Sequence, residues 1–445
     1  MTIREAAAAL GSRKVSCLEL TNRCLDQIAK LNPRLNAFIT VTEEAARKRA
    51  SELDRDLANG IDHGPLHGIP IAHKDLIWTG GVRTTSGSKL FVDFVPASDA
   101  PVVEKLNRAG AVMLGKTGLH EIAYGVTSEN PHFGVIRNPR DLERSPGGSS
   151  GGSGAAVAAD MAFMATGTDT GGSIRIPASF CGVVGLKPTY GAVDRSGIQP
   201  LGFSLDHVGP LARTVADASL TYHAMAQPPY ARPAPASVQS IRIGLPENFY
   251  LSGVDPEVKQ AVQNAARVAE QLGARVSPVR VPDVEALNAT GRVILLAEAS
   301  ALYEPYWERR EDFGADVLAL LDQGRLVPAT DYVNAQRLRR ALLKDFHALF
   351  ASIDCLFTPT TPITAPRIGQ KQVELDGQMV DTRLATTRFV RGFNVLGFPA
   401  LSLPCGTSSQ GLPVGLQIIA RPYEEALLLS LGETLEPRFA SPPPM

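Results

Sequence analysis

The sequence is short of cysteine and has no excess of charge of either sign. Its five cysteines among 445 residues include no CxxC pair, which argues against a disulfide framework or a zinc ribbon. The 44 lysines and arginines nearly balance the 45 aspartates and glutamates, for a net charge of −1. That balance argues against a broad nucleic-acid-binding surface. The eight histidines include no HExxH motif and no pair at ligand spacing, so we expect no metal requirement.

Apolar segments that could cross a membrane are also missing. The longest uncharged stretch, residues 392–420, contains three prolines and five glycines, a density that a spanning helix does not tolerate. The apolar run near the start, residues 6–10, is too short for a signal peptide. The sequence therefore predicts a soluble, cytoplasmic protein that does not associate with a membrane.

Glycine and proline, in contrast, are abundant, with 40 and 33 residues. Between these breakers, helix and strand patterns alternate, which is typical of an α/β fold. Buried strands are predicted at residues 69–72 and 112–114, and a mostly helical stretch at residues 284–350. The proline-rich stretch at residues 227–238 is the best candidate for a linker.

Two glycine-rich segments lie close together in the chain. Residues 147–154 read GGSSGGSG, and residues 167–177 read GTDTGGSIRIP. By composition alone, the first segment fits a flexible linker. However, an apolar, helix-like run follows it, and both segments contain a Gly-Gly-Ser turn beside an apolar element. Glycines allow backbone N–H groups to converge on one point, as the binding of an oxyanion requires.

Three generic motifs compete with that interpretation. Residues 110–117 match the phosphate-binding P-loop pattern, but a predicted helix precedes them and the intervening residues are strand-like. Residues 148–152 match the nucleophile elbow of α/β-hydrolases, with Ser150 as nucleophile, and this esterase stays an alternative although no later histidine stands in an informative context. Asn288 begins a glycosylation sequon, which has no meaning in a cytoplasmic chain.

A serine hydrolase without a suitable histidine needs another base, and a desolvated lysine meets that need. Lys74 follows the apolar strand predicted at residues 69–72, which places its ammonium near buried surface. A lone lysine after a strand is more often a surface residue. Lys74 is therefore a candidate base on position alone.

These segments together resemble the amidase signature hydrolases. Residues 145–153 are similar to the start of the family's signature, residues 167–178 to its nucleophile segment and residues 68–75 to its lysine segment. The separations of the central residues, 149 − 74 = 75 and 173 − 149 = 24, are also those of the family. Weaker similarity extends from about residue 3 to residue 436.

The resemblance implies a catalytic set and the residues around it. Lys74 would be the base, Ser149 the serine that passes protons, held by a cis peptide bond, and Ser173 the nucleophile. The backbone N–H groups that would bind the oxyanion belong to Thr170, Gly171, Gly172 and Ser173. The residues that would hold the loops are Ser150, Asp169 and Arg175. The residues that would line the substrate pocket are Ala123, Tyr124, Gly125, Phe389 and Asn394.

The resemblance also implies a fold and an organisation. The fold would be one α/β/α domain over residues 1–445 around a large twisted mixed sheet. The catalytic core would span about residues 60–226, and the helices at about residues 284–350 would form a lid near the pocket mouth. No cofactor is implied, and we expect a monomer or a homodimer.

Two forms of the activity remain open. In the first, the chain is a stand-alone hydrolase of small-molecule amides, extending to aryl esters and carbamates. In the second, it is the glutaminase component, the A subunit, of glutamyl-tRNA amidotransferase, which makes ammonia from glutamine for partner subunits. The helical stretch at residues 307–350 and the short chain favour the first. A small acidic substrate would require an arginine in the pocket; Arg388 and Arg391 are the candidates, although we expect both at the surface.

Overall fold

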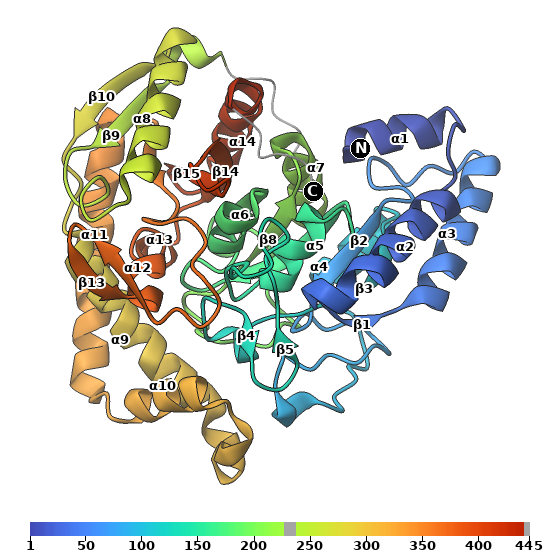
Figure 1. Cartoon of the computed structure of the whole chain (residues 1–445), viewed down its shortest axis with the longest axis horizontal. Helices are drawn as coiled ribbons and strands as arrows, with labels where there is room; N and C mark the ends of the chain where they lie inside the picture. The colour runs from blue at the N-terminus through green and yellow to red at the C-terminus, as the bar shows by residue number, and fades with distance from the viewer. Residues whose placement is uncertain (227–236, 440–445) are drawn as a thin grey trace.

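The computed structural model describes residues 1–226 and 237–439. Within these residues, eleven strands form one mixed sheet that runs through the molecule (Figure 1). In spatial order, the strands are β1 (Phe38–Val41), β3 (Val112–Thr117), β2 (Pro70–Lys74), β6 (Met164–Asp169), β8 (His207–Ala212), β7 (Val184–Lys187), β14 (Ala400–Thr407), β15 (Pro413–Ala420), β11 (Cys355–Pro359), β9 (Arg242–Pro246) and β10 (Arg275–Val279).

The sheet combines parallel ends with an antiparallel centre. Strands β3, β2 and β6 are parallel to one another, and so are β11, β9 and β10. The strands from β6 through β8, β7, β14 and β15 to β11 pair in antiparallel fashion, as does the edge strand β1 with β3. The expected α/β fold around a large mixed sheet is confirmed.

Helices lie around this sheet along its length (Figure 1). They are α1 (Ile3–Gly11), α2 (Cys17–Leu35), α3 (Glu43–Ala58), α4 (Pro101–Arg108), α5 (Gly151–Ala158), α6 (Arg175–Cys181), α7 (Val215–Met225), α8 (Pro256–Gln271), α9 (Val284–Tyr303), α10 (Ala315–Arg325), α11 (Ala329–Ser352), α12 (Thr382–Thr387), α13 (Arg391–Leu396) and α14 (Glu425–Leu435). Two small hairpins complete the structure: β4 (Glu129–Asn130) with β5 (Gly134–Val135), and β12 (Gln372–Leu375) with β13 (Gln378–Asp381).

A local sequence signal explains where helix α2 begins. The Ser16 side chain accepts a hydrogen bond from Glu19 N at 3.0 Å, and the Glu19 carboxylate accepts one from Ser16 N at 2.7 Å. This capping box starts α2, whose buried face includes Leu20, Cys24 and Ile28. No helix in the described part of the chain is both long and apolar enough to span a membrane.

The fold decides the outcome of one sequence pattern, the P-loop match. Residues 110–117 do not wrap a phosphate, because most of them form β3, where the Lys116 ammonium is buried. It donates to the hydroxyls of Thr79 and Thr84 at 3.0 Å each, and to the Ile77 carbonyl. Residues 227–236 of the predicted linker lie outside the described residues.

The predicted helical stretch contains α9, α10 and α11, with a 3₁₀ segment (Glu304–Asp312) after α9. Figure 1 shows these helices at the opposite side of the molecule from α1, α2 and α3. Helix α9 packs against α10, α11 and the short helix α13. These contacts join the C-terminal segment that carries α13 to the helices of residues 284–350.

Candidate active site

Lys74 ends strand β2 in the interior of the protein, with 0% of its surface exposed. Its Nζ donates to three hydroxyls: Ser149 Oγ at 2.8 Å, Ser150 Oγ at 2.9 Å and Thr168 Oγ1 at 2.8 Å. Thr168 is nearby because β2 pairs in parallel with β6, on which Thr168 lies. All three partners are neutral, so no carboxylate compensates the charge of the ammonium by direct contact.

This environment sets the protonation of Lys74. Burial lowers its pKa to about 7, against the opposing influence of the negative charges of Asp169 and Asp206. Burial also raises the pKa of Asp206 to about 6. A lysine with a pKa near 7 has a large neutral fraction at physiological pH, and a neutral amine accepts a proton.

Ser149 and Ser150 lie where the glycine-rich segment 147–154 enters helix α5. The Gly148–Ser149 peptide bond is cis, as the resemblance implies. The segment is buried and its second half forms the first turn of α5, so it is not a flexible linker. Close packing requires glycine at position 152, because a Cβ there would lie 2.5 Å from backbone atoms of Ala37 and Gly118.

Ser173 lies in the turn between β6 and α6, with 6% of its surface exposed. The carboxylate of Asp169 holds the turn by accepting from Gly172 N at 2.8 Å and from Ile174 N at 3.1 Å. Gly172 has a φ of +123°, and a Cβ there would collide with Val390. The turn thus requires glycine immediately before the serine.

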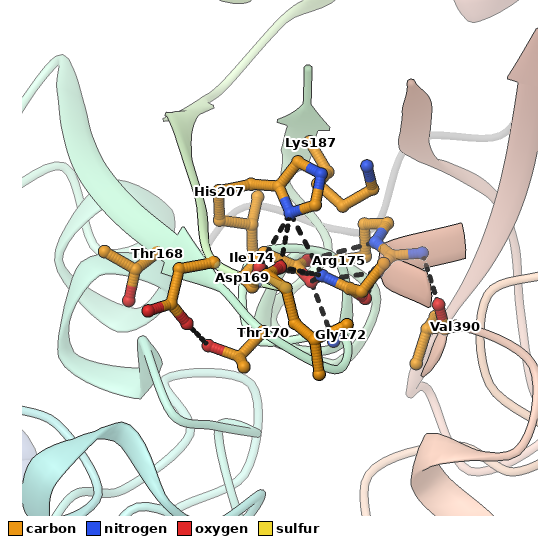
Figure 2. Close-up of polar contacts among 12 residues, drawn as sticks. Thr168, Asp169, Thr170, Gly172, Ile174, Arg175, Lys187, His207 and Val390 are labelled. Carbon is orange, nitrogen blue, oxygen red and sulfur yellow. Dashed lines mark hydrogen bonds and ion pairs between the residues drawn. The ribbon is translucent and has the colours of Figure 1, made fainter. Parts of the chain in front are cut away.

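Asp169 belongs to a buried polar network that joins the two halves of the chain (Figure 2). Arg175 donates to its two carboxylate oxygens at 3.0 and 2.9 Å, to Val390 O at 2.9 Å and to Gln417 Oε1 at 2.7 Å. Burial by itself raises the pKa of Asp169, but the charge and hydrogen bonds of Arg175 hold it well below its usual range. Asp169 is therefore a permanent anion that fixes the Ser173 turn.

The backbone around Ser173 leaves some N–H groups free. Gly172 N is committed to Asp169, whereas the N–H groups of Thr170, Gly171 and Ser173 donate to no other residue in the described chain. The Thr170 hydroxyl donates to Asp206 Oδ1 at 2.6 Å. Backbone N–H groups without an acceptor beside a serine are available to bind an anion.

The expected pocket residues fall into two groups. Ala123, Tyr124 and Gly125 border cavities: Ala123 one of about 350 Å³ that Thr170 also lines, Gly125 one of about 570 Å³, and Tyr124 both the latter and one of about 290 Å³. Phe389 and Asn394, which we expected to face the pocket, are buried completely. Phe389 packs against aromatic rings, and Asn394 joins the Asp169 network.

Ser150 does not stand in a nucleophile elbow. It caps α5 without a preceding strand, and its Oγ accepts from Lys74 and donates to Thr168 O at 3.2 Å. Within the described residues, no histidine bonds to it; the buried His207 directs Nδ1 to the carbonyls of Leu205 and Asp169 instead. Among the same residues, no cluster of His, Cys, Asp or Glu is placed to hold a metal ion.

Sequence reasoning missed several contributors to the site. Thr168 is the third acceptor of Lys74, and Gln417 accepts from Arg175. Thr168 stands within the segment that resembles the family's nucleophile segment, so its position was the only available signal. Gln417 comes from β15, and only the sheet topology brings it to Arg175.

The comparisons with known proteins agree with this geometry. A family model, Amidase, matches residues 19–429. The chain is similar to the A subunit of the glutamyl-tRNA(Gln) amidotransferase of Carboxydothermus hydrogenoformans, with 39% identity over a 474-residue alignment that covers 98% of this chain and 96% of that protein. It is also 37% identical to a solved structure described as an amidase, with a TM-score of 0.94 and coverage of 99% and 100%.

A further solved structure is equally similar in fold. It is described as a vestigial protein complex that reveals the evolutionary origins of an s-triazine catabolic enzyme, with 36% identity, a TM-score of 0.94 and 100% coverage of both chains. On the family match and these relatives, the chain belongs to the amidase signature family.

Proposed function

We propose that this protein hydrolyses the C–N bond of a linear amide through an acyl-serine intermediate. The observation that carries the proposal is the buried Lys74, 2.8 Å from Ser149 Oγ and bonded only to neutral hydroxyls, beside the turn that holds Ser173. Lys74 in its neutral form takes the proton of Ser149 while Ser149 takes that of Ser173.

The remaining steps follow from the same residues. Ser173 Oγ forms a bond to the carbonyl carbon, and the N–H groups of Thr170, Gly171 and Ser173 bind the resulting oxyanion. The C–N bond breaks as the proton returns from Lys74 through Ser149 to the leaving nitrogen. Water then attacks the acyl ester by the same proton route, which releases the carboxylic acid and restores Ser173.

Other residues support this reaction by position. Asp169 and Arg175 fix the Ser173 turn, and Ser150 holds Lys74 by accepting its hydrogen bond. We also propose that residues 1–445 act as one unit, in which the helices of residues 284–350 cover the pocket mouth. The walls of the 290 Å³ cavity favour this, because α9 supplies Leu295 and Leu296, and α10 supplies Leu320.

The name of the curated relatives favours one form of this function. They are A subunits of glutamyl-tRNA amidotransferases at 39% identity over nearly full length, so glutamine with partner subunits is the first substrate system to test. This choice departs from our sequence-based preference for a stand-alone hydrolase. The stand-alone form remains the second candidate because a structure described simply as an amidase matches the whole chain at a TM-score of 0.94.

One assay separates the two forms. The purified chain is incubated with glutamine, aryl amides, aryl esters and carbamates, first alone and then with the partner subunits of a relative, and ammonia or amine release is measured. Glutamine turnover that requires the partners supports the amidotransferase form. Turnover of other amides by the chain alone supports the stand-alone enzyme. If a serine-reactive probe fails to label Ser173 and no amide is cleaved, the proposed function is wrong.

A further inference from the structure

Arg391 lies beside the turn that holds Ser173 and has no anionic partner in the described chain. Arg391 is only 9% exposed, contrary to our expectation of a surface residue, and its buried Nε has no hydrogen-bond acceptor. Burial and the charges of Arg383 and Arg292 lower its pKa to about 10, so it remains a cation at neutral pH. A buried cation without a partner is costly in free energy.

The backbone places this guanidinium beside the nucleophile turn. A Cβ on Gly171, two residues before Ser173, would lie 3.8 Å from Arg391 Nε. Gly291 on α9 leaves room for the arginine's stem, since a Cβ there would lie 3.3 Å from Arg391 Cγ and 3.4 Å from Cδ. Gly291 thus leaves room for the stem of the buried arginine, and Gly171 lies within ordinary contact distance of its guanidinium.

The cavity at Arg391 has a volume of about 290 Å³ and a positive lining. Its acidic wall residue, Asp381, is already engaged as the cap of α12, because its carboxylate accepts from Leu384 N at 2.9 Å. The Arg383 guanidinium lies over the Tyr124 ring, 5.3 Å from the ring centre. The charged and aromatic groups that line the cavity are Tyr124, Arg292, Arg383, Arg391 and Asp381.

We propose that this cavity binds a carboxylate carried by the amide substrate, with Arg391 as its principal ligand and Arg383 beside it. The inference rests on the proposed function, since it assigns the substrate class of the same site. A guanidinium presents parallel N–H donors that match a planar carboxylate. The small volume and the closeness of Arg391 to Gly171 favour a short substrate, and glutamine is one compound that carries both a carboxylate and a carboxamide.

Matched substrates test the assignment. Glutaramate is compared with valeramide, in which a methyl group replaces the carboxylate, and N-propionylglycine with N-ethylpropionamide, which places the acid on the amine side. The wild type should prefer the acid in at least one pair. R391M should reduce that acid-to-neutral ratio of kcat/KM by about 10- to 100-fold, the range for the loss of hydrogen bonds to a charged group. R391K keeps the positive charge but lacks the planar pair of N–H donors, so its acid-to-neutral ratio should lie between those of the wild type and R391M.

Arg388 provides the matched control. It lies three residues before Arg391, but its guanidinium stacks on Phe249, 4.6 Å from the ring centre, and borders a different cavity. R388M should therefore leave both the ratio and the basal activity at wild-type values. Equal turnover of acid and neutral substrates by the wild type, or an unchanged ratio in R391M, would overturn the assignment while leaving the amide hydrolysis intact.

A binding measurement keeps this test separate from the chemistry. Glutarate should raise the melting temperature of the wild type and of S173A, because a ligand that binds only the folded state stabilises it. It should not raise that of R391M. Equal stabilisation by inorganic phosphate at the same concentration would contradict a carboxylate site, and so would stabilisation of R391M by glutarate.

Discussion

The Asn394 side chain hydrogen-bonds to Asp169, which lies 225 positions earlier in the chain. Its side-chain amide donates to the Asp169 carbonyl at 2.7 Å and to the carboxylate Oδ1 at 2.8 Å, while its own oxygen accepts from Arg175 at 2.7 Å. Because Asp169 in turn holds Gly172 and Ile174 on either side of Ser173, a residue of α13 helps to set the position of Ser173.

Asn394→Ala should therefore lower both stability and turnover. Loss of these buried hydrogen bonds should cost about 1–3 kcal/mol of unfolding free energy, and kcat should fall about tenfold as the Ser173 turn loosens. Urea unfolding and steady-state kinetics measure the two effects. Asn248→Ala is the control. The Asn248 side chain also makes two hydrogen bonds, both with the backbone of Val281, but it lies outside this network. A kcat loss of the same size in both variants would contradict the positioning role.

Ser173→Ala should abolish hydrolysis, with a loss of at least about 10⁴-fold and an unchanged melting curve, because the other hydroxyl of its turn, that of Thr170, is bonded to Asp206. An activated ester should leave an acyl group on Ser173 of the wild type, detectable by peptide mass spectrometry. Ser150→Ala should retain measurable turnover, since Ser150 contacts Lys74 and Thr168 and lies outside the Ser173 turn. An acyl group found on Ser150 would reverse the assignment.

Lys74 should give activity and stability the same direction of pH dependence. With a folded pKa of about 7, kcat/KM should rise with pH through 7 as the ammonium loses its proton. In the unfolded chain a lysine has a pKa of about 10.4. Between these values the unfolded state binds more protons, so the contribution of Lys74 to stability rises with pH across that window.

Lys74→Met removes both trends. The variant should lose turnover, more for an amide than for a matched activated ester, because the leaving nitrogen needs the returned proton. Its unfolding free energy relative to the wild type should be most favourable at pH 6 and decline toward pH 9. If kcat/KM of the wild type does not change between pH 6 and 8, the lowered pKa of Lys74 is contradicted.

Arg391→Met should stabilise the protein although it removes a binding group. The substitution replaces a buried cation, which has no anionic partner among the described residues, with an apolar side chain of similar length. This should raise the free energy of unfolding by about 1–3 kcal/mol. Arg388→Met should instead lower it by about 0.5–1 kcal/mol, because that guanidinium stacks on Phe249. Thermal unfolding of both variants checks the opposite signs.

The part of the site that sequence could predict is the part encoded locally. Lys74, Ser149 and Ser173 each stand in a short segment whose glycines or strand pattern already restrict the backbone, and the structure brings the three segments together. The proposed oxyanion-binding set omits Gly172, because its N–H donates to the Asp169 carboxylate, a contact that the sequence does not reveal.

The C-terminal residues could not be placed in the same way. Arg391 and Asn394 lie three positions apart on a helix of six residues, too short for its apolar pattern to define a buried face. The packing of α13 against α9 sends Asn394 into the Asp169 network and Arg391 to the cavity. Nothing in the sequence around them distinguishes these two environments.

The residues proposed to break the bond and those proposed to select the substrate lie on separate stretches of the chain. Lys74, Ser149 and Ser173 come from its first 173 residues, whereas Arg292, Arg383 and Arg391 lie between residues 292 and 391. Mutations in the later stretch can therefore exchange one substrate for another while the bond-breaking apparatus stays untouched. A chain divided in this way can change its substrate specificity while the reaction stays the same. Residues 284–391 are therefore the place to begin redesign.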